Sequence, residues 1–356
     1  MLLAAAAATD AGADPPGPPE APGGSATDPT TRPDSPAPDG PADGPFAWPL
    51  LPAFGEEGLI DWLDFDIIRE KPRTRAGLRS ILYDHRGVSG QSAQVGMTRY
   101  DVGVRNYGSS AAFGPHARIR LLDLDTHAVL PDTGERLPQQ LWDVQAGMTF
   151  LWLLPPGLFD ITLGSASDRP FAGDDELTAD VTYLIGNPYE ETGFLFIVNY
   201  SNNRDWLNRI IFPGFMFRFQ PDDRLKVVAG FPFSGVRWRP DERWSFSATY
   251  SFPRTVRARA AYRPVRALEL FAGFDWENQR YFRHDRAETK DRLWYVEKRV
   301  TGGVRWEIGR HAFVEAAAGY AFNRFFFEGE TYEDREDNRV NVSDGAFAAV
   351  RVGVRF

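Results

Sequence analysis

The chain has 356 residues, a formal net charge of −9, 14% aromatic residues and no cysteine. The absence of cysteine excludes disulfide frameworks, thiol catalysis and Cys-ligated zinc or iron–sulfur sites. The acidic balance argues against a nucleic-acid-binding protein, which needs a basic face.

The composition also bears on how the chain could reside in a membrane. No run approaches the roughly 20 apolar residues that a membrane helix needs. Residues 148–159 come nearest, and Pro155 and Pro156 interrupt them. Residence in a membrane would therefore require strands, which need only alternate apolar residues when they close into a barrel.

The first 45 residues have the composition of a leader and linker. Leu2, Leu3 and five alanines resemble the tail of a secretory signal peptide without its basic part, or else form a plain alanine tract. Residues 10–44 are mostly Pro, Gly, Ala, Asp, Ser and Thr, so little apolar burial offsets the entropy of ordering. We expect residues 1–45 to be a signal-peptide remnant and a disordered Pro-rich head in the periplasm.

Residues 46–88 form a lead-in segment of ambiguous pattern. Leu59, Leu63 and Ile67 would share one face of a helix, whereas Leu63, Phe65 and Ile67 would share one face of a strand. A short interfacial or plug helix is favoured over a strand.

Strand patterns dominate residues 89–356. Apolar and polar residues alternate with a period of two, most regularly over residues 256–262, 268–276 and 312–320. Earlier strands are predicted at residues 97–105, 117–124, 142–151, 159–165, 177–185, 194–200 and 210–219. Since a spanning strand needs about 9 to 11 residues, we predict about 12 strands, within a range of 10 to 14.

Recurring turns indicate which strand ends lie on the same side. An aromatic residue, a turn led by Pro221, Pro240 or Pro264, and an apolar restart occur three times. Barrels have short periplasmic turns and longer outer loops. We therefore place these turns and residues 308–310 on the periplasmic side, and residues 280–292 and 334–343 outside.

The last stretch, residues 346–356, has one apolar face that ends in an aromatic residue. Its final members, Val352, Val354 and Phe356, resemble the signal that the bacterial barrel-assembly machinery reads. We expect this machinery to be a partner of the C-terminal strand.

Several short segments resemble an uncharacterised family of bacterial outer-membrane β-barrel proteins, a domain of unknown function. They are residues 230–233 (Gly-Phe-Pro-Phe), 236–240 (Val-Arg-Trp-Arg-Pro), 297–299 (Glu-Lys-Arg), 319–324 (Gly-Tyr-Ala-Phe-Asn-Arg) and Phe356. The similarity covers roughly residues 90–356. It implies a fold and a location, and it implies no activity.

The faces opposite the apolar rows carry charge. These side chains would fill a narrow lumen with cross-strand ion pairs or line an aqueous pore in a wider one. Lys298 falls instead in the row of Val296 and Val300, which predicts either an interfacial lysine or a bulge. The lumen candidates are Arg257, Arg259, Glu269, Asp275, Glu297, Arg299, Arg305, Glu315, Arg351 and Arg355.

Catalytic and metal-binding patterns are weak. The five histidines lack ligand spacing, and the acidic residues at 328–337 match no calcium loop. His284 and Asp285 lie in a predicted outer loop, where a barrel protease would need such a pair. We expect no enzyme, cofactor or metal.

Together these patterns predict a closed, antiparallel, all-β transmembrane barrel in lipid of the bacterial outer membrane. Its expected role is a passive pore for small solutes or a structural envelope barrel. A soluble periplasmic or secreted all-β ligand-binding protein is the alternative, and a barrel hydrolase is a more distant one. A lipid-exposed band would be flanked by aromatics, for which the candidates are Tyr262, Trp276, Trp294, Trp306 and Tyr320.

Overall fold

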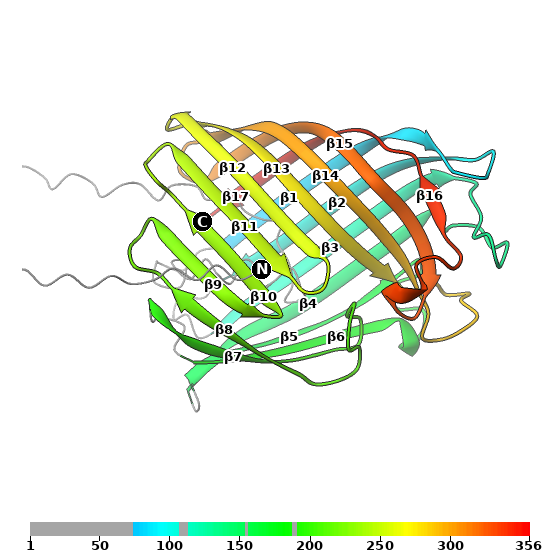
Figure 1. The fold of residues 1–356 in the computed structure, drawn as a ribbon, viewed down its shortest axis with the longest axis horizontal. Helices are drawn as coiled ribbons and strands as arrows, with labels where there is room; N and C mark the ends of the chain where they lie inside the picture. Colours follow the sequence, from blue (N-terminus) through cyan, green and yellow to red (C-terminus); the bar gives the residue numbers. More distant parts are fainter. Residues whose placement is uncertain (1–73, 107–112, 154–155, 187–190) are drawn as a thin grey trace, which may run out of the picture. The chain divides into compact units, whose positions relative to one another are not determined.

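A computed structural model describes residues 74–106, 113–153, 156–186 and 191–356, which form one closed antiparallel β-sheet (Figure 1). The expected signal remnant, Pro-rich head and most of the lead-in segment lie outside the described residues. Within these ranges no helix has the length and apolar character of a membrane span. The strands are β1 (Thr74–Gly87), β2 (Gln94–Asn106), β3 (Phe113–Thr126), β4 (Gln140–Leu153), β5 (Pro156–Ser167), β6 (Leu177–Ile185), β7 (Thr192–Ser201), β8 (Phe212–Phe219), β9 (Leu225–Phe231), β10 (Phe233–Trp238), β11 (Trp244–Ser251), β12 (Thr255–Val265), β13 (Leu268–Tyr281), β14 (Arg292–Ile308), β15 (Ala312–Gly329), β16 (Val340–Val342) and β17 (Gly345–Arg355).

The wall closes because consecutive strands from β1 to β15 pair with one another, β17 pairs with β15, and β17 returns to β1. The short strand β16 pairs with the loop-rim part of β15, and β17 pairs with the rest of β15. These two strands therefore occupy one position in the wall, so the seventeen strands form sixteen positions. The predicted closed all-β barrel is confirmed, and the predicted count of about 12 strands is wrong. One strand, β1, lies before residue 89, and connections as short as the single Pro232 between β9 and β10 leave room for more strands than the sequence pattern indicated.

The barrel also begins earlier than expected. The sequence pattern places its start at residue 89, whereas β1 occupies Thr74–Gly87 within the supposed lead-in segment. The alternation in β1 is hard to read because Arg79 and Ser80 stand side by side in its middle.

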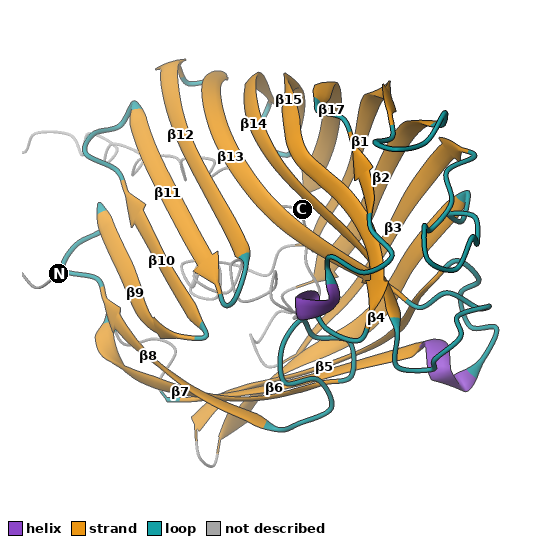
Figure 2. Cartoon of the chain, turned by 45° about the vertical axis from the view of Figure 1, so that its right-hand side comes forward, coloured by secondary structure: helices purple, strands orange, loops and turns teal. Residues whose placement is uncertain are grey.

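Both ends of the described barrel meet at one rim, here called the terminal rim. The amide of Thr74 donates to the carbonyl of Phe356 at 3.1 Å, and the reverse bond measures 2.9 Å. The Pro-led turns and residues 309–311 lie at this rim, and the longer segments 282–291 and 330–339 lie at the opposite loop rim (Figure 2). The predicted grouping of turns and loops is therefore the observed one.

The outer face carries a band of exposed apolar residues such as Leu78, Val300 and Val350. Trp306 lies at the terminal-rim side of this band, and Tyr320, next to Val300 across the strands, lies at the other side. Trp294 was predicted to flank the band but is fully buried. It packs with Phe327 and with Tyr332 of a short 3₁₀ turn (η2, Tyr332–Asp334), beyond the band toward the loop rim.

The barrel narrows toward the loop rim because β13 reaches across to β5. Phe282 donates its amide to the Ala166 carbonyl at 2.7 Å, and Ser167 and Phe282 form a parallel bridge. This contact divides the interior of the barrel into two parts. One part is enclosed by β13, β14, β15, β16, β17 and β1 to β5, and the other by β6 to β12. The inward side chains of the enclosed part, among them Ile81, Leu122 and Phe326, form one buried apolar core. The remaining wall includes its shortest strands, β9 with 7 residues and β10 with 6.

Glycines on the inner wall make room for aromatic rings. Gly353 lies directly opposite Phe313, and Gly303 directly opposite Phe271. A Cβ added at either glycine would overlap the facing ring. Each ring in turn lies under a guanidinium group, with Arg305 3.7 Å above Phe313 and Arg259 3.5 Å above Phe271. A glycine in a strand is expected where another group approaches so closely.

We predict that Gly353→Ala lowers the free energy of unfolding by about 1 to 3 kcal/mol, because the Phe313 ring must leave its position. Denaturant unfolding of the refolded protein in lipid vesicles measures this change. Gly302→Ala is the matched control, since its Cβ would meet only a backbone oxygen at 3.9 Å. Equal stability of the two variants would contradict the proposed packing role.

Candidate functional site

The ten lumen candidates lie on strand faces opposite the exposed apolar band, and all are buried or half-buried. They separate into groups at two levels of the barrel. Asp275, Glu297 and Arg299 lie in the inner parts of β13 and β14, and Arg257 lies near the loop-rim end of β12; we call this group the central ion network. The others, Arg259, Glu269, Arg305, Glu315, Arg351 and Arg355, lie nearer the terminal rim.

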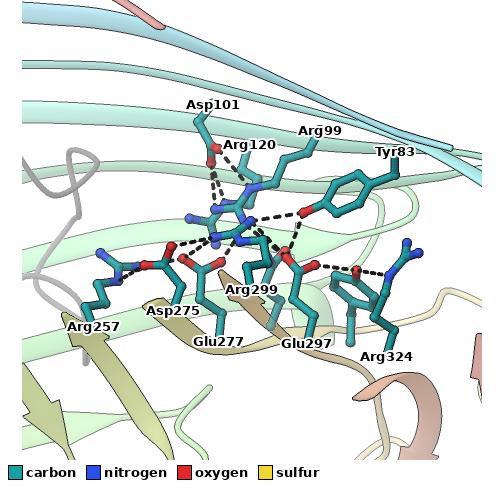
Figure 3. Close-up of polar contacts among 12 residues, drawn as sticks. Tyr83, Arg99, Asp101, Arg120, Arg257, Asp275, Glu277, Glu297, Arg299 and Arg324 are labelled. Carbon is teal, nitrogen blue, oxygen red and sulfur yellow. Dashed lines mark hydrogen bonds and ion pairs between the residues drawn. The ribbon is translucent and has the colours of Figure 1, made fainter. Parts of the chain in front are cut away.

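Arg299 is the hub of the central ion network (Figure 3). Its guanidinium contacts Glu297 at 2.9 Å and Glu277 at 3.1 Å, and it donates to the hydroxyl of Tyr83 at 3.0 Å. Arg257 reaches Glu277 from β12 at 3.0 Å. Since Arg299, Glu277 and Glu297 are almost inaccessible to water, their charges compensate one another in a site of low polarisability.

One bond of this network crosses the lumen. Arg99 on β2 contacts Glu277 on β13 at 2.6 Å, although four strand positions separate β2 from β13 along the wall. Arg99 also binds Asp101 at 2.8 Å, and Asp101 binds Arg120 of β3 at 2.6 Å. The network therefore forms a polar layer directly beside the apolar core, and the two together fill the narrow part of the barrel.

Sequence reasoning missed Tyr83, Arg99, Asp101, Arg120 and Glu277. The signal was present for Arg99 and Asp101, because they alternate with the outward Tyr100 and Val102 in a strand that was predicted. It was absent for Tyr83, an aromatic residue in a strand that the pattern did not reveal.

The second group of candidates forms smaller clusters near the terminal rim. Arg259 contacts Glu269 at 3.1 Å and Glu315 at 3.2 Å, and Arg351 lies directly opposite Glu315. Arg305 binds Glu307 at 2.7 Å, and Arg355 lies 3.6 Å from the same carboxylate. These residues do not join the central ion network through any of these contacts.

Lys298 shows both features that its pattern predicted. The pairing of β14 with β15 shifts between Val296 and Lys298, where Asn323 adopts a positive φ of 53°. Lys298 nevertheless stays on the outer face, with its ammonium 4.6 Å from the centre of the Trp276 ring. An ammonium over an aromatic face suits the boundary between lipid and water.

The wall outside the narrow part has a different inner surface. The inward residues of β11 all carry small hydroxyl side chains, and three of them, Ser245, Ser247 and Thr249, remain partly exposed. Further round, the Asp160 carboxylate accepts from Thr149 at 2.8 Å, and His116 lies 3.0 Å from the Thr162 hydroxyl. This side of the lumen therefore combines polar side chains on β11 and at Asp160 with buried apolar side chains such as Leu184 and Met216 on the neighbouring strands.

The loop between β7 and β8 folds against this polar side. Arg204 donates to Asn199 on the inner wall at 2.5 Å and to the carbonyl groups of Trp206, Leu207 and Ile210. Burial raises the pKa of Asp205, although Arg254 lies 3.4 Å away and Arg280 is near. The Arg204 guanidinium thus holds the loop in place through its hydrogen bonds to Asn199 and to three carbonyl groups of the loop.

The residues that suggested chemistry are engaged elsewhere. His284 contacts Glu176 at 3.0 Å, while Asp285 pairs with Arg283, so the two do not form a dyad. In the acidic segment, Glu328 pairs with Arg283 and Glu336 with Arg339. Within the part of the chain that the structure describes, no three His, Asp or Glu side chains are grouped to hold a metal.

Comparisons with known proteins find similar barrels and no close relative. No protein-family model and no curated protein matches the chain. An outer-membrane channel from Pseudomonas putida F1 is 10% identical over 81% of this chain and 96% of its own, with a TM-score of 0.31. The TodX monoaromatic hydrocarbon channel is 9% identical over 85% and 94%, with a TM-score of 0.37. OmpT, an outer membrane protein of Vibrio cholerae, is 13% identical over 80% and 96%, with a TM-score of 0.32.

We predict that Arg99→Leu lowers the free energy of unfolding by about 3 to 5 kcal/mol, because it leaves Glu277 and Asp101 buried with less compensation. Glu277→Leu should act similarly, and the double variant should lose less than the two single losses combined. Denaturant unfolding in lipid vesicles provides the three values. Arg339→Ala, whose partner Glu336 is 68% exposed, should cost below about 1 kcal/mol. Simple additivity of the Arg99 and Glu277 variants would show that their bond across the lumen does not stabilise the barrel.

Proposed function

We propose that this protein resides in the bacterial outer membrane and lets small hydrophilic solutes cross it passively. The observation that carries this proposal is a single closed wall whose outer face is apolar and exposed and whose inner face carries charges and hydroxyls. Lipid is the solvent that such an outer face suits, because a large contiguous apolar surface is unfavourable in water.

The polar side of the lumen, along β11, is the proposed path for solutes. The apolar core and the central ion network occupy the part enclosed from β13 to β5, whereas Ser245 and Ser247 keep partial access to water. Next to this path, Arg257 pairs with Glu277, and Arg259 pairs with Glu269 and Glu315. We therefore propose selection by size and hydrophilicity rather than by the sign of charge.

Two other roles follow from the same fold. A structural envelope barrel would share the wall but conduct nothing. A soluble ligand-binding barrel would need its apolar outer face covered, and exposed residues such as Val350 and Trp306 make that less favourable. Hydrolysis at His284 and Asp285 has the least support, since each side chain is paired with another residue.

The orientation follows from the same proposal. We place the terminal rim in the periplasm, with the Pro-rich head, and the longer loops outside, because barrels of this class have short periplasmic turns. Val352, Val354 and Phe356 would bring the C-terminal strand to the barrel-assembly machinery. The wall gives no preference for one oligomeric state.

Cysteine accessibility tests the path. The natural chain has no cysteine, so Ser247→Cys introduces a single thiol on the inner face of β11. We predict that a charged, water-soluble thiol reagent reduces the conductance of single channels in a planar bilayer, because the added group narrows the lumen.

Ala248→Cys is the matched control, since the next residue along a strand faces the opposite side. Its modification should leave conductance unchanged. If the thiol reagent reduced the conductance of both variants equally, or of neither, the solute path would lie elsewhere than along β11. An absence of conductance despite confirmed insertion would favour the structural barrel, and solubility without detergent would overturn the membrane assignment.

A further inference from the structure

Lys298 is a basic residue on the outer side of the wall. It is next to Val300 in the outward row of β14, and Val300 belongs to the exposed apolar band. Among the described residues no carboxylate forms an ion pair with its ammonium group, which lies over the Trp276 ring instead. A cation beside lipid is unfavourable unless water or an anion compensates its charge.

The bulge beside Lys298 brings a second polar side chain onto the same surface. Asn323 directly follows Phe322, the residue opposite Lys298, and it is exposed, whereas the next residue, Arg324, points inward and is 2% exposed. The backbone amide of Asn323 donates to the Asp344 carboxylate at 3.0 Å, which fixes the bulge. Bulges re-aim side chains in this way, so an amide group and an ammonium group share one part of the outer face.

A second basic side chain lies on the loop-rim side of Lys298. The guanidinium group of Arg339 is 4.1 Å from the centre of the Phe325 ring, and Phe325 is opposite Val296, the next outward residue of β14. Successive outward residues of a strand are about 7 Å apart. Because charge-assisted hydrogen bonds measure about 2.8 Å, the oxygens of one phosphate can contact both cations.

The acids of the nearby loop are engaged with arginines. Arg339 donates to both carboxylate oxygens of Glu336, at 2.9 and 3.0 Å, and to Asn341 at 2.7 Å. Arg335 lies 3.5 Å from the same carboxylate and 3.6 Å from Glu333. Within the residues that the structure describes, none of these acids pairs with Lys298. The loop therefore leaves the charge of Lys298 uncompensated.

Aromatic side chains mark the level of this region relative to the apolar band. Trp276 lies under the ammonium group of Lys298, and Tyr320, opposite Val300, is 47% exposed. Trp and Tyr side chains are enriched where a barrel meets the lipid headgroups. Lys298 is therefore at the headgroup level on the loop-rim side, rather than in the middle of the band.

We propose that Lys298, Asn323 and Arg339 form a site for the phosphate of an anionic lipid headgroup, in the leaflet nearest the loop rim. Lys298 supplies the charge that no described residue offsets, Asn323 an amide donor, and Arg339 a guanidinium group. The site holds one lipid against the outer wall of β14 and β15 (Figure 1). Zwitterionic lipids bind there less well, because their own ammonium group offsets the phosphate. This inference rests on the proposed membrane residence and does not depend on conduction.

Native mass spectrometry of the full chain in detergent measures lipid binding directly. We expect the natural protein to retain phosphatidylglycerol in preference to phosphatidylcholine. Lys298→Gln should weaken phosphatidylglycerol binding by about 3- to 10-fold, the effect of one partly exposed charge-assisted contact. Arg339→Gln should act in the same direction, and Lys298→Arg should preserve binding. Lys290→Gln is the matched control, because Lys290 is exposed in the loop between β13 and β14.

Three results would overturn the proposal. The first is equal phosphatidylglycerol binding by Lys298→Gln and the natural protein. The second is an equal loss in Lys290→Gln, which would indicate a general effect of surface charge. The third comes from inorganic phosphate as the competing probe: if it bound as tightly as phosphatidylglycerol and depended equally on Lys298, the ligand would be a free anion rather than a lipid.

Unfolding in vesicles separates this site from the proposed function. In equal parts of phosphatidylcholine and phosphatidylglycerol, the natural protein should unfold at a higher denaturant concentration than in phosphatidylcholine alone, and Lys298→Gln should lose most of this difference. Heat-dependent gel mobility checks that the variants are folded barrels. Inserted variants with the same lipid dependence would refute the lipid site alone, whereas failure of every variant to insert would refute membrane residence itself.

Discussion

The whole structure depends on the closure of one hydrogen-bonded ring. A backbone amide or carbonyl facing lipid has no water to bind, so a membrane-exposed sheet can have no free edge. The final pairing of β17 with β1, extended to the bonds between Thr74 and Phe356, removes the last edge. Closure pairs the backbone amides and carbonyls of the strands with one another. The polarity of the side chains then determines which environment suits the outer face and which suits the inner face.

Closure fixes the class of the barrel but leaves its interior to be filled in different ways. Where β13 reaches β5, the enclosed volume is small enough for side chains to meet, and the apolar core and central ion network occupy it. On the inner face of that side, aromatic rings such as that of Phe313 lie over glycines such as Gly353. The side along β11 keeps only small hydroxyl groups inside. One continuous sheet therefore combines a packed half with a side whose β11 wall is lined by hydroxyl groups.

The sequence predicted those features that depend on a period of two. The closed all-β barrel, the grouping of turns and the inward direction of the charged residues all follow from alternation between faces. The number of strands could not be obtained this way, since β9 and β10 are too short to show the period and only Pro232 separates them. The bond between Arg99 and Glu277 was equally out of reach, because it depends on how far β13 bends across the lumen.

The shortness of β9 and β10 has a consequence for the surrounding bilayer. At about 3.3 Å per residue, the 6 residues of β10 rise by about 20 Å even before tilt is considered, less than the apolar band of about 25 Å that outer-membrane barrels present. In the proposed outer-membrane setting, lipids beside these strands would have to compress, while those beside β14 and β15, with 17 and 18 residues, would not. Such one-sided hydrophobic mismatch costs free energy along the thin side. In that setting the bilayer would be deformed on one side of the barrel only, beside its shortest strands.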